Sequence, residues 1–340
     1  IEPSRGLGDV YKRQAFILYD ICYYWMHRIH HEIKVFWATH VVHHHGEEFN
    51  LATALRQTST GFLWKWVFFL PLFIIGIPPQ MYVTVAGLNL VYQFWVHTEH
   101  IGRLGFLEYI FVTPSNHRVH HAQNEDYLDA NYGGVFILWD RLFGTFIDER
   151  SDLKPVYGTV KPLKSFNPFW ANIEVFYQMI FDSYHTEKFT DKIRVWFSPP
   201  NWRPEDVSMK YPIDKNDLSS FEKYDPNISL REKIFAGAQF TVINLMTIVM
   251  LFNVQNYIYS EIISIVLLVV SSSITNSFSL DGHKVGFPAD LLKSVIVVLC
   301  LQFGYFSTSM NFFILCYAIF TLLISTFILL TKDRKIISPV

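Results

Sequence analysis

The feature of this chain that most constrains its fold is a set of long apolar runs. Two of them, at residues 61–77 and 80–96, lie close together, and four more fill the last third of the chain. A helix needs about 20 apolar residues to cross the hydrocarbon core of a bilayer. Hydrophobic residues make up 51% of the chain and charged residues 17%, which suits a membrane protein with large polar loops. We therefore expect an all-α fold, a polytopic integral membrane helical bundle. The four later runs lie at 234–253, 256–280, 287–306 and 309–331. A shorter apolar stretch at 131–147 contains Asp140 and Arg141, and we expect an interfacial or core helix there, not a span.

The first two runs predict a helical hairpin. Pro78 and Pro79 stand between them as a break, so the chain crosses and returns, or dips in and out. Either course places residues 27–45 and 97–121 on the same side of the bilayer. The tail at 332–340 carries three basic residues, and basic flanks favour the cytoplasm. We therefore expect both segments to lie on the cytoplasmic side.

Charge and cysteine content narrow the possible functions. The formal net charge is −2, which gives no basic signal for nucleic acid, so no nucleic-acid partner is expected. Cys22, Cys300 and Cys316 lie singly inside apolar runs. Their spacing predicts neither a disulfide framework nor a cysteine metal site.

The histidines are the second strong feature. Of the 14 in the chain, 12 lie between residues 27 and 121 in close-spaced clusters. A helix brings residues three and four apart onto one face, so His40, His43 and His44 present their rings together. Neutral imidazole is a strong ligand for iron, zinc and copper. Nine donors are too many for one ion and suit two, so the pattern predicts a dinuclear site. The predicted metal ligands are His27, His31, His40, His43, His44, His97, His117, His120 and His121.

The remaining histidines fit this pattern less well. His30, His45 and His100 are off the favoured spacing, and we expect two of these three not to bind metal directly. His185 and His283 are isolated, and we interpret them as ordinary polar residues. A single histidine on an apolar face is usually a satisfied core residue, whereas repeated HxxHH triplets indicate a metal site.

The histidine pattern and its flanks resemble the fatty acid hydroxylase/sterol desaturase superfamily of membrane di-iron enzymes. Within it, the resemblance is closer to the alkylglycerol (glyceryl-ether) monooxygenase family. The segments that carry this closer match are YYWMHRIHHE (23–32), NLATALRQ (50–57), YQFWVHTE (92–99), LEYIFVTPSNHRVHH (107–121) and NYGGVFILWDRLFGTF (131–146).

The resemblance implies two iron ions, with zinc a possible substitute, and a membrane lipid and dioxygen as substrates. It also implies an electron donor, either tetrahydrobiopterin or a redox protein. In that family an alkylglycerol is hydroxylated next to its ether oxygen and falls apart to a fatty aldehyde and a glycerol. The resemblance matches Glu32 to the glutamate beside the first histidine pair, and Glu32 is our candidate catalytic residue. Glu32 and Glu99 also lie next to predicted ligands and are candidates to fix the imidazole tautomers.

Composition and resemblance together predict five segments. The start has no Met, and the segment IEPSRGLGDVYKRQ (1–14) has the character of foreign sequence, so we expect it not to belong to the native fold. The apolar stretch that follows is too short to span a membrane, so we expect the catalytic domain to be truncated at its amino-terminal side. We expect residues 1–14 to be non-native sequence and residues 15–182 to form a fatty acid hydroxylase-type catalytic domain. We expect a polar loop region at 183–233, carboxyl-terminal transmembrane helices at 234–331 and a cytosolic tail at 332–340.

Two other functions stay open from sequence. The same site could desaturate or hydroxylate a sterol or a fatty acid. A histidine-rich metal transporter or metal-binding membrane protein belongs to a different class. A transporter should carry ionisable residues within several spans, and the carboxyl-terminal runs have almost none, which favours the enzyme. Sequence leaves the exact lipid, the reductant, the metal and the oligomeric state open.

Overall fold

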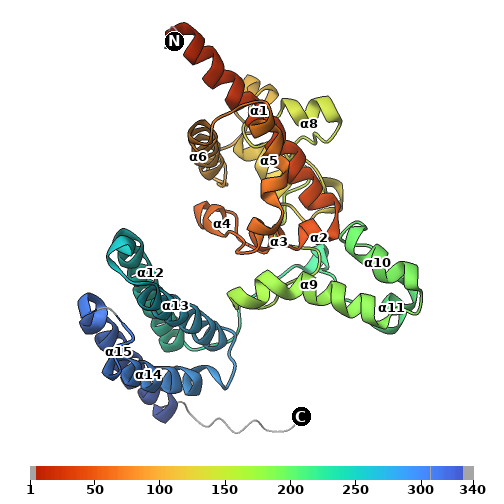
Figure 1. Cartoon of the computed structure of the whole chain (residues 1–340). Helices are drawn as coiled ribbons and strands as arrows, with labels where there is room; N and C mark the ends of the chain where they lie inside the picture. Colours follow the sequence, from red (N-terminus) through yellow and green to blue (C-terminus); the bar gives the residue numbers. More distant parts are fainter. Residues whose placement is uncertain (1–4, 307, 332–340) are drawn as a thin grey trace. The chain divides into compact units, whose positions relative to one another are not determined.

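The computed structural model describes residues 5–306 and 308–331, and every regular element in these ranges is a helix (Figure 1). The only strand-like pairings there are two isolated bridges. The prediction of an all-α fold is confirmed. The chain divides into two compact units, which we describe separately. The amino-terminal unit contains residues up to 163 and 172–223, and the carboxyl-terminal unit contains 164–171 and residues from 224.

Three helices form the apolar part of the amino-terminal unit: α1 (Arg5–Glu32), α5 (Lys65–Ile74) and α6 (Pro79–Trp95). α1 packs against both α5 and α6. Tyr19 of α1 stacks on Phe69 of α5, with ring centroids 4.7 Å apart. Proline is favoured at the start of a helix because its missing N–H is not needed there, and α6 begins at Pro79. The two proline positions thus separate α5 from α6 as the sequence predicted.

α5 is shorter than its apolar run. It has ten residues, so it is about 15 Å long and cannot cross a hydrocarbon core of about 30 Å. Gly76 has φ of +92°, a conformation that glycine adopts without strain, and the helix ends just before it. Of the two predicted courses for the hairpin, only the shallow one fits α5.

Short helices and loops surround these three. α7 begins at a capping box, in which Thr113 and Asn116 satisfy each other's backbone amides. The region 183–233 was predicted as a polar loop, and the part of it in this unit, residues 183–223, includes two short α-helices. The other helices of this unit are α2 (Lys34–Trp37), α3 (Val41–His44), α4 (Leu51–Leu55), α7 (Pro114–His120), α8 (Leu138–Phe143), α9 (Pro168–His185), α10 (Phe189–Phe197) and α11 (Glu205–Lys210).

Residues 131–147 were predicted as one helix, and that prediction is wrong for most of the segment. Only α8 is helical. The preceding stretch is irregular because Asp140 accepts hydrogen bonds from the backbone N–H groups of Tyr132 (2.7 Å) and Gly133 (2.8 Å). Asn131 has φ of +57°, which a helix does not allow. The apolar content of this segment reflects burial, not a helix.

The carboxyl-terminal unit is a bundle of α12 (Leu230–Phe252), α13 (Tyr259–Leu280), α14 (Gly286–Gln302) and α15 (Thr308–Thr331), each packed on the next in sequence. Its apolar core includes Met246, Ile265 and Ile314. Among the described residues, α12, α13 and α15 are long and apolar enough to span a membrane, while α14 has 17 residues. At both ends, each of the four helices lies within four residues of its predicted run. The predicted tail at 332–340 lies outside the described residues.

A buried polar network lies inside this bundle. Lys293 pairs with Asp290 at 2.8 Å, and Gln239 donates to the other Asp290 oxygen at 3.0 Å. Thr275 and Tyr317 also contact the Lys293 ammonium, at 3.2 and 3.1 Å. The expectation of almost no ionisable residues in the carboxyl-terminal runs is wrong, because Asp290 and Lys293 both lie in the run at 287–306. The charge content of these runs therefore does not argue against a transporter.

Candidate metal centre

All nine histidines predicted as ligands are buried in the amino-terminal unit and gather into two groups. Within each group the nitrogens that could bind a metal lie within 4.8 Å of one another. The rings come from the last turns of α1, from α3 and α7 with their flanking residues, and from His97, two positions beyond the end of α6. The first histidine group is His27, His31, His40, His44 and His120, and the second histidine group is His43, His97, His117 and His121.

Each HxxHH triplet is divided between the groups. His40 and His44 belong to the first group, whereas His43 belongs to the second. The triplet at 117–121 is reversed: its outer histidines belong to the second group, and His120 to the first. The same short helices therefore hold both groups side by side, and the rings of His43 and His44 are 5.4 Å apart. This arrangement suits two neighbouring ions.

Backbone carbonyls fix the protonation of several rings. A carbonyl only accepts hydrogen bonds, so a ring nitrogen that contacts one carries the proton, and the other nitrogen of the neutral ring carries the lone pair. Four rings contact a carbonyl through Nδ1: His27 with Tyr132 (2.8 Å), His43 with Arg56 (3.1 Å), His97 with Gln93 (2.8 Å) and His120 with Ala130 (2.9 Å).

The tautomers that follow test whether a metal fits. The Nε2 atoms of His43 and His97 face each other at 3.2 Å, each with a lone pair. Two acceptors repel each other at this distance unless a cation lies beside them. Nε2 of His120 is buried with no hydrogen-bond partner among the described residues, although a buried polar atom normally has one. The donor set therefore fits metal ions.

Burial also keeps these rings neutral. Removal from water lowers the pKa of His43, His44 and His117 well below its usual value, and the neighbouring imidazoles lower it further. Burial lowers the pKa of His97 and of His120 to about 4. Neutral imidazole is the form that binds metals, so at neutral pH these donors need not lose a proton first.

The two glutamates proposed beside the ligands lie elsewhere. The Glu32 carboxylate accepts from Arg28 at 2.8 Å on a partly exposed surface, and Glu99 accepts from the Tyr157 hydroxyl at 3.2 Å. For the four rings described above, backbone carbonyls occupy the position expected for a carboxylate. The prediction that Glu32 or Glu99 fixes a tautomer is wrong for these rings. A catalytic role for Glu32 stays a prediction.

The histidines that were off the favoured spacing are absent from both groups within the described chain. His30 is buried and contacts the Met26 carbonyl at 2.6 Å. His45 lies 3.5 Å from Glu174. His100 is exposed, and so is the isolated His283. His185 stacks against a phenylalanine one turn earlier in α9.

Two buried aspartates support the centre and were missed from sequence. Asp140 holds the backbone at Tyr132, whose carbonyl contacts His27. Asp20, which belongs to α1, accepts hydrogen bonds from the backbone N–H groups of Val135 (2.9 Å) and Phe136 (3.0 Å). Both residues were visible as charges within apolar stretches, which is a signal that such a residue has a fixed partner.

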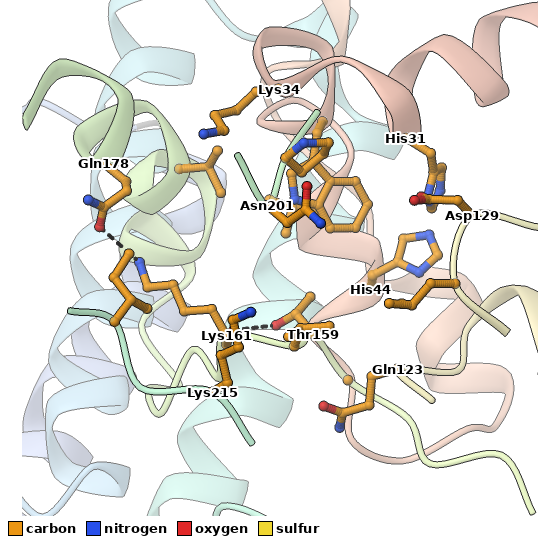
Figure 2. A pocket seen from close by; sticks show the side chains of 18 of the residues that line it. His31, Lys34, His44, Gln123, Asp129, Thr159, Lys161, Gln178, Asn201 and Lys215 are labelled. Carbon is orange, nitrogen blue, oxygen red and sulfur yellow. Dashed lines mark hydrogen bonds between the residues drawn. The ribbon is translucent and has the colours of Figure 1, made fainter. Parts of the chain in front are cut away.

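A cavity of about 230 Å³ adjoins the first histidine group (Figure 2). His31 and His44 lie along one side of it beside Asp129, and Gln178 lies on the opposite side. The third histidine that lines it is His120.

Fold and site together define a helical, membrane-associated protein with a buried, all-histidine candidate centre for two metal ions. Residues 14–145 match the family model of the fatty acid hydroxylases, described as "Fatty acid hydroxylase". This stretch contains both histidine groups. Over this stretch the chain matches the fatty acid hydroxylase family.

Curated relatives narrow the resemblance further. The chain is 36% identical over 295 residues to the alkylglycerol monooxygenase of Danio rerio, covering 86% of this chain and 65% of that protein. It is 41% identical over 213 residues to that of Xenopus tropicalis (62% and 47%) and 44% identical over 190 residues to that of Homo sapiens (56% and 42%). The chain thus spans between about two fifths and two thirds of these relatives. No solved structure matches it.

Proposed function

We propose that this chain is part of a membrane di-iron monooxygenase that cleaves the ether bond of alkylglycerols. The observation that carries the proposal is the gathering of nine neutral, buried histidines into two adjacent groups. An all-nitrogen pair of sites suits two iron ions, and the relatives listed above are named alkylglycerol monooxygenases. Bound iron would supply the activation of dioxygen.

The proposed reaction replaces one C–H bond of the substrate. The carbon next to the ether oxygen gains a hydroxyl whose oxygen comes from dioxygen, and the second oxygen atom leaves as water after two electrons and two protons are added. The resulting hemiacetal breaks its C–O bond to release a fatty aldehyde and a glycerol. The histidines would hold the metals, the carbonyls of Tyr132 and Ala130 would orient two of the rings, and burial would exclude bulk water.

Family resemblance supports tetrahydrobiopterin as the electron donor, and we propose it on that ground alone. The basic tail after the last helix supports a cytoplasmic position for the metal centre. Residues 27–45 and 97–121 meet in the metal centre, which is compatible with both segments lying on one side of the bilayer. Single-cysteine labelling from either face of sealed vesicles, at an exposed position such as His100, would decide the side.

The test is metal analysis and product analysis on the iron-loaded chain. We expect two irons per chain and conversion of an alkylglycerol to its aldehyde with tetrahydrobiopterin, with one ¹⁸O atom from ¹⁸O₂ in the aldehyde. His120→Ala should lose metal and turnover, and His185→Ala should keep both. Oxidation of a sterol or acyl lipid with no action on alkylglycerol would replace the proposed substrate. Full metal content and turnover in His120→Ala would refute the site.

A further inference from the structure

The two histidine groups have different surroundings. His31, His44 and His120 of the first group line the cavity, and no histidine of the second group lies among its lining residues in the described chain (Figure 2). All nine rings are buried to a similar degree, so the difference is one of neighbours and not of overall depth. The first group borders this cavity, and the second does not.

Aromatic rings close off the second group. Phe49 is buried and lies against the rings of His97 and His121, at centroid distances of 5.5 and 5.2 Å. Tyr157 stacks on the outer face of Phe49 at 4.9 Å and an interplanar angle of 18°. Its hydroxyl donates to Glu99, which fixes the ring in this position. The second group therefore has a two-ring wall where the first has a cavity.

The lining of the cavity is mostly apolar, with polar side chains set into it. Its walls include Gln123, Thr159 and Asn201, and the cations Lys34 and Lys215 (Figure 2). Trp37, Val41 and Leu128 supply apolar surface close to the histidines. Among its lining residues in the described chain, none comes from the apolar helices α5 or α6. Gln123, Thr159 and Lys34 already form hydrogen bonds within the chain, so a small apolar molecule such as dioxygen can occupy the cavity without leaving them unpaired.

We propose that this cavity brings small exogenous ligands, dioxygen among them, to a metal ion in the first histidine group only. Phe49 and Tyr157 keep the ion in the second group closed to such ligands. The inference rests on the proposed function, because it assumes that both groups hold iron. It adds that the two irons are unequal, with the first binding ligands and the second retained behind the aromatic wall.

Nitric oxide is the probe, because it binds ferrous iron as a stable mimic of dioxygen and changes the Mössbauer spectrum of the iron it binds. The sample is the full chain loaded with two ⁵⁷Fe(II) in detergent. We expect one of the two irons to convert to the nitrosyl form and the other to keep its ferrous spectrum at saturating nitric oxide. Conversion of both irons, or of neither, would overturn the inference.

Two variants, each with a matched control, test the cavity and the aromatic wall. Leu128→Trp adds bulk to the cavity next to the first group and should slow nitrosyl formation several-fold. Leu142→Trp, at an exposed position of α8, is the matched control. Phe49→Ala should let nitric oxide convert the second iron as well, whereas Phe106→Ala, at an exposed position, should not. Should Phe49→Ala fail to fold, Phe49→Leu keeps bulk but loses the stacked ring and should give partial conversion.

The outcomes separate this inference from the proposed function. An unchanged rate in Leu128→Trp refutes the cavity as the route, and a single nitrosyl iron in a folded Phe49 variant refutes the aromatic wall. In both cases iron content and turnover of alkylglycerol would remain as proposed. A chain that binds no iron, or that binds two irons and leaves alkylglycerol untouched, refutes the proposed function instead.

Discussion

Asp140→Asn tests how a residue outside the metal centre sets the affinity of the first histidine group. One carboxylate oxygen of Asp140 accepts from the Tyr132 N–H (2.7 Å) and the Thr145 hydroxyl (2.7 Å), and the other accepts from the Gly133 N–H (2.8 Å). The Tyr132 carbonyl in turn accepts from His27. Asparagine has the same shape but can offer only one acceptor oxygen.

The magnitude follows from these contacts. Asparagine places an NH₂ group against the Gly133 N–H, so a buried donor loses its acceptor, at a cost of about 1–3 kcal/mol. The turn at 132–133 then shifts, and the carbonyl that orients His27 moves with it. Changes to groups that orient a ligand typically lower metal affinity about 10–100-fold. We expect a loss in that range at the first group and little change at the second.

The assay is iron content per chain after equilibration with ferrous ion buffered by a chelator over a wide range of free iron. Asp140→Asn should split the binding curve, with one iron bound as in the unsubstituted chain and one requiring about 10–100-fold more free iron. Asp148→Asn is the control, because Asp148 is exposed and pairs with Arg103 at the surface. If Asp140→Asn binds both irons with unchanged affinity, the chain of contacts from Asp140 to His27 has no role in metal binding.

Three further predictions concern the metal groups and the bundle. His43→Ala and His44→Ala should each retain about one iron, and Mössbauer spectra should show that the retained irons differ; identical spectra would contradict the division of the triplet. Lys293→Met should destabilise the carboxyl-terminal bundle by about 3–5 kcal/mol in denaturant unfolding, because it leaves Asp290 buried and unpaired. The double variant Asp290→Leu/Lys293→Met should recover most of this loss, and a double variant as unstable as the single one would contradict the reasoning. Iron removal by chelation should lower the melting temperature, since a ligand at 100 times its Kd stabilises the folded state by about 2.7 kcal/mol; an unchanged melting temperature would argue against binding to the folded chain.

The sequence was most informative where short-range geometry decides the outcome. The HxxxH and HxxHH spacings made it predictable that eight of the nine rings lie beside a partner from their own cluster, because a single helical turn brings such residues together. They could not assign His43 and His44 to different groups, because that depends on how α3 faces α7 in the folded chain. The lengths of the apolar runs likewise predicted the ends of α12 to α15 to within a few residues.

The groups that orient the rings could not be found from sequence. They are backbone carbonyls, which every residue has, so the identity of Tyr132 or Ala130 carries no signal for this role. The failed helix at 131–147 has a related cause. Asp140 satisfies the N–H groups at Tyr132 and Gly133 from a distance, and a hydrophobicity pattern cannot register such a contact.

The Asp290–Lys293 pair has a consequence for how the bundle enters a membrane. Both residues belong to α14 and are three positions apart, so their charges can neutralise within that helix before any other helix is present. A lone acid or a lone base near the middle of an inserting helix costs about 2.5–3.5 kcal/mol during translocon insertion. A helix that carries its own counter-ion can therefore partition into lipid as an uncharged segment. Gln239 and Tyr317 can then join the pair when α12 and α15 arrive, so the polar contacts that hold the finished bundle also guide its assembly.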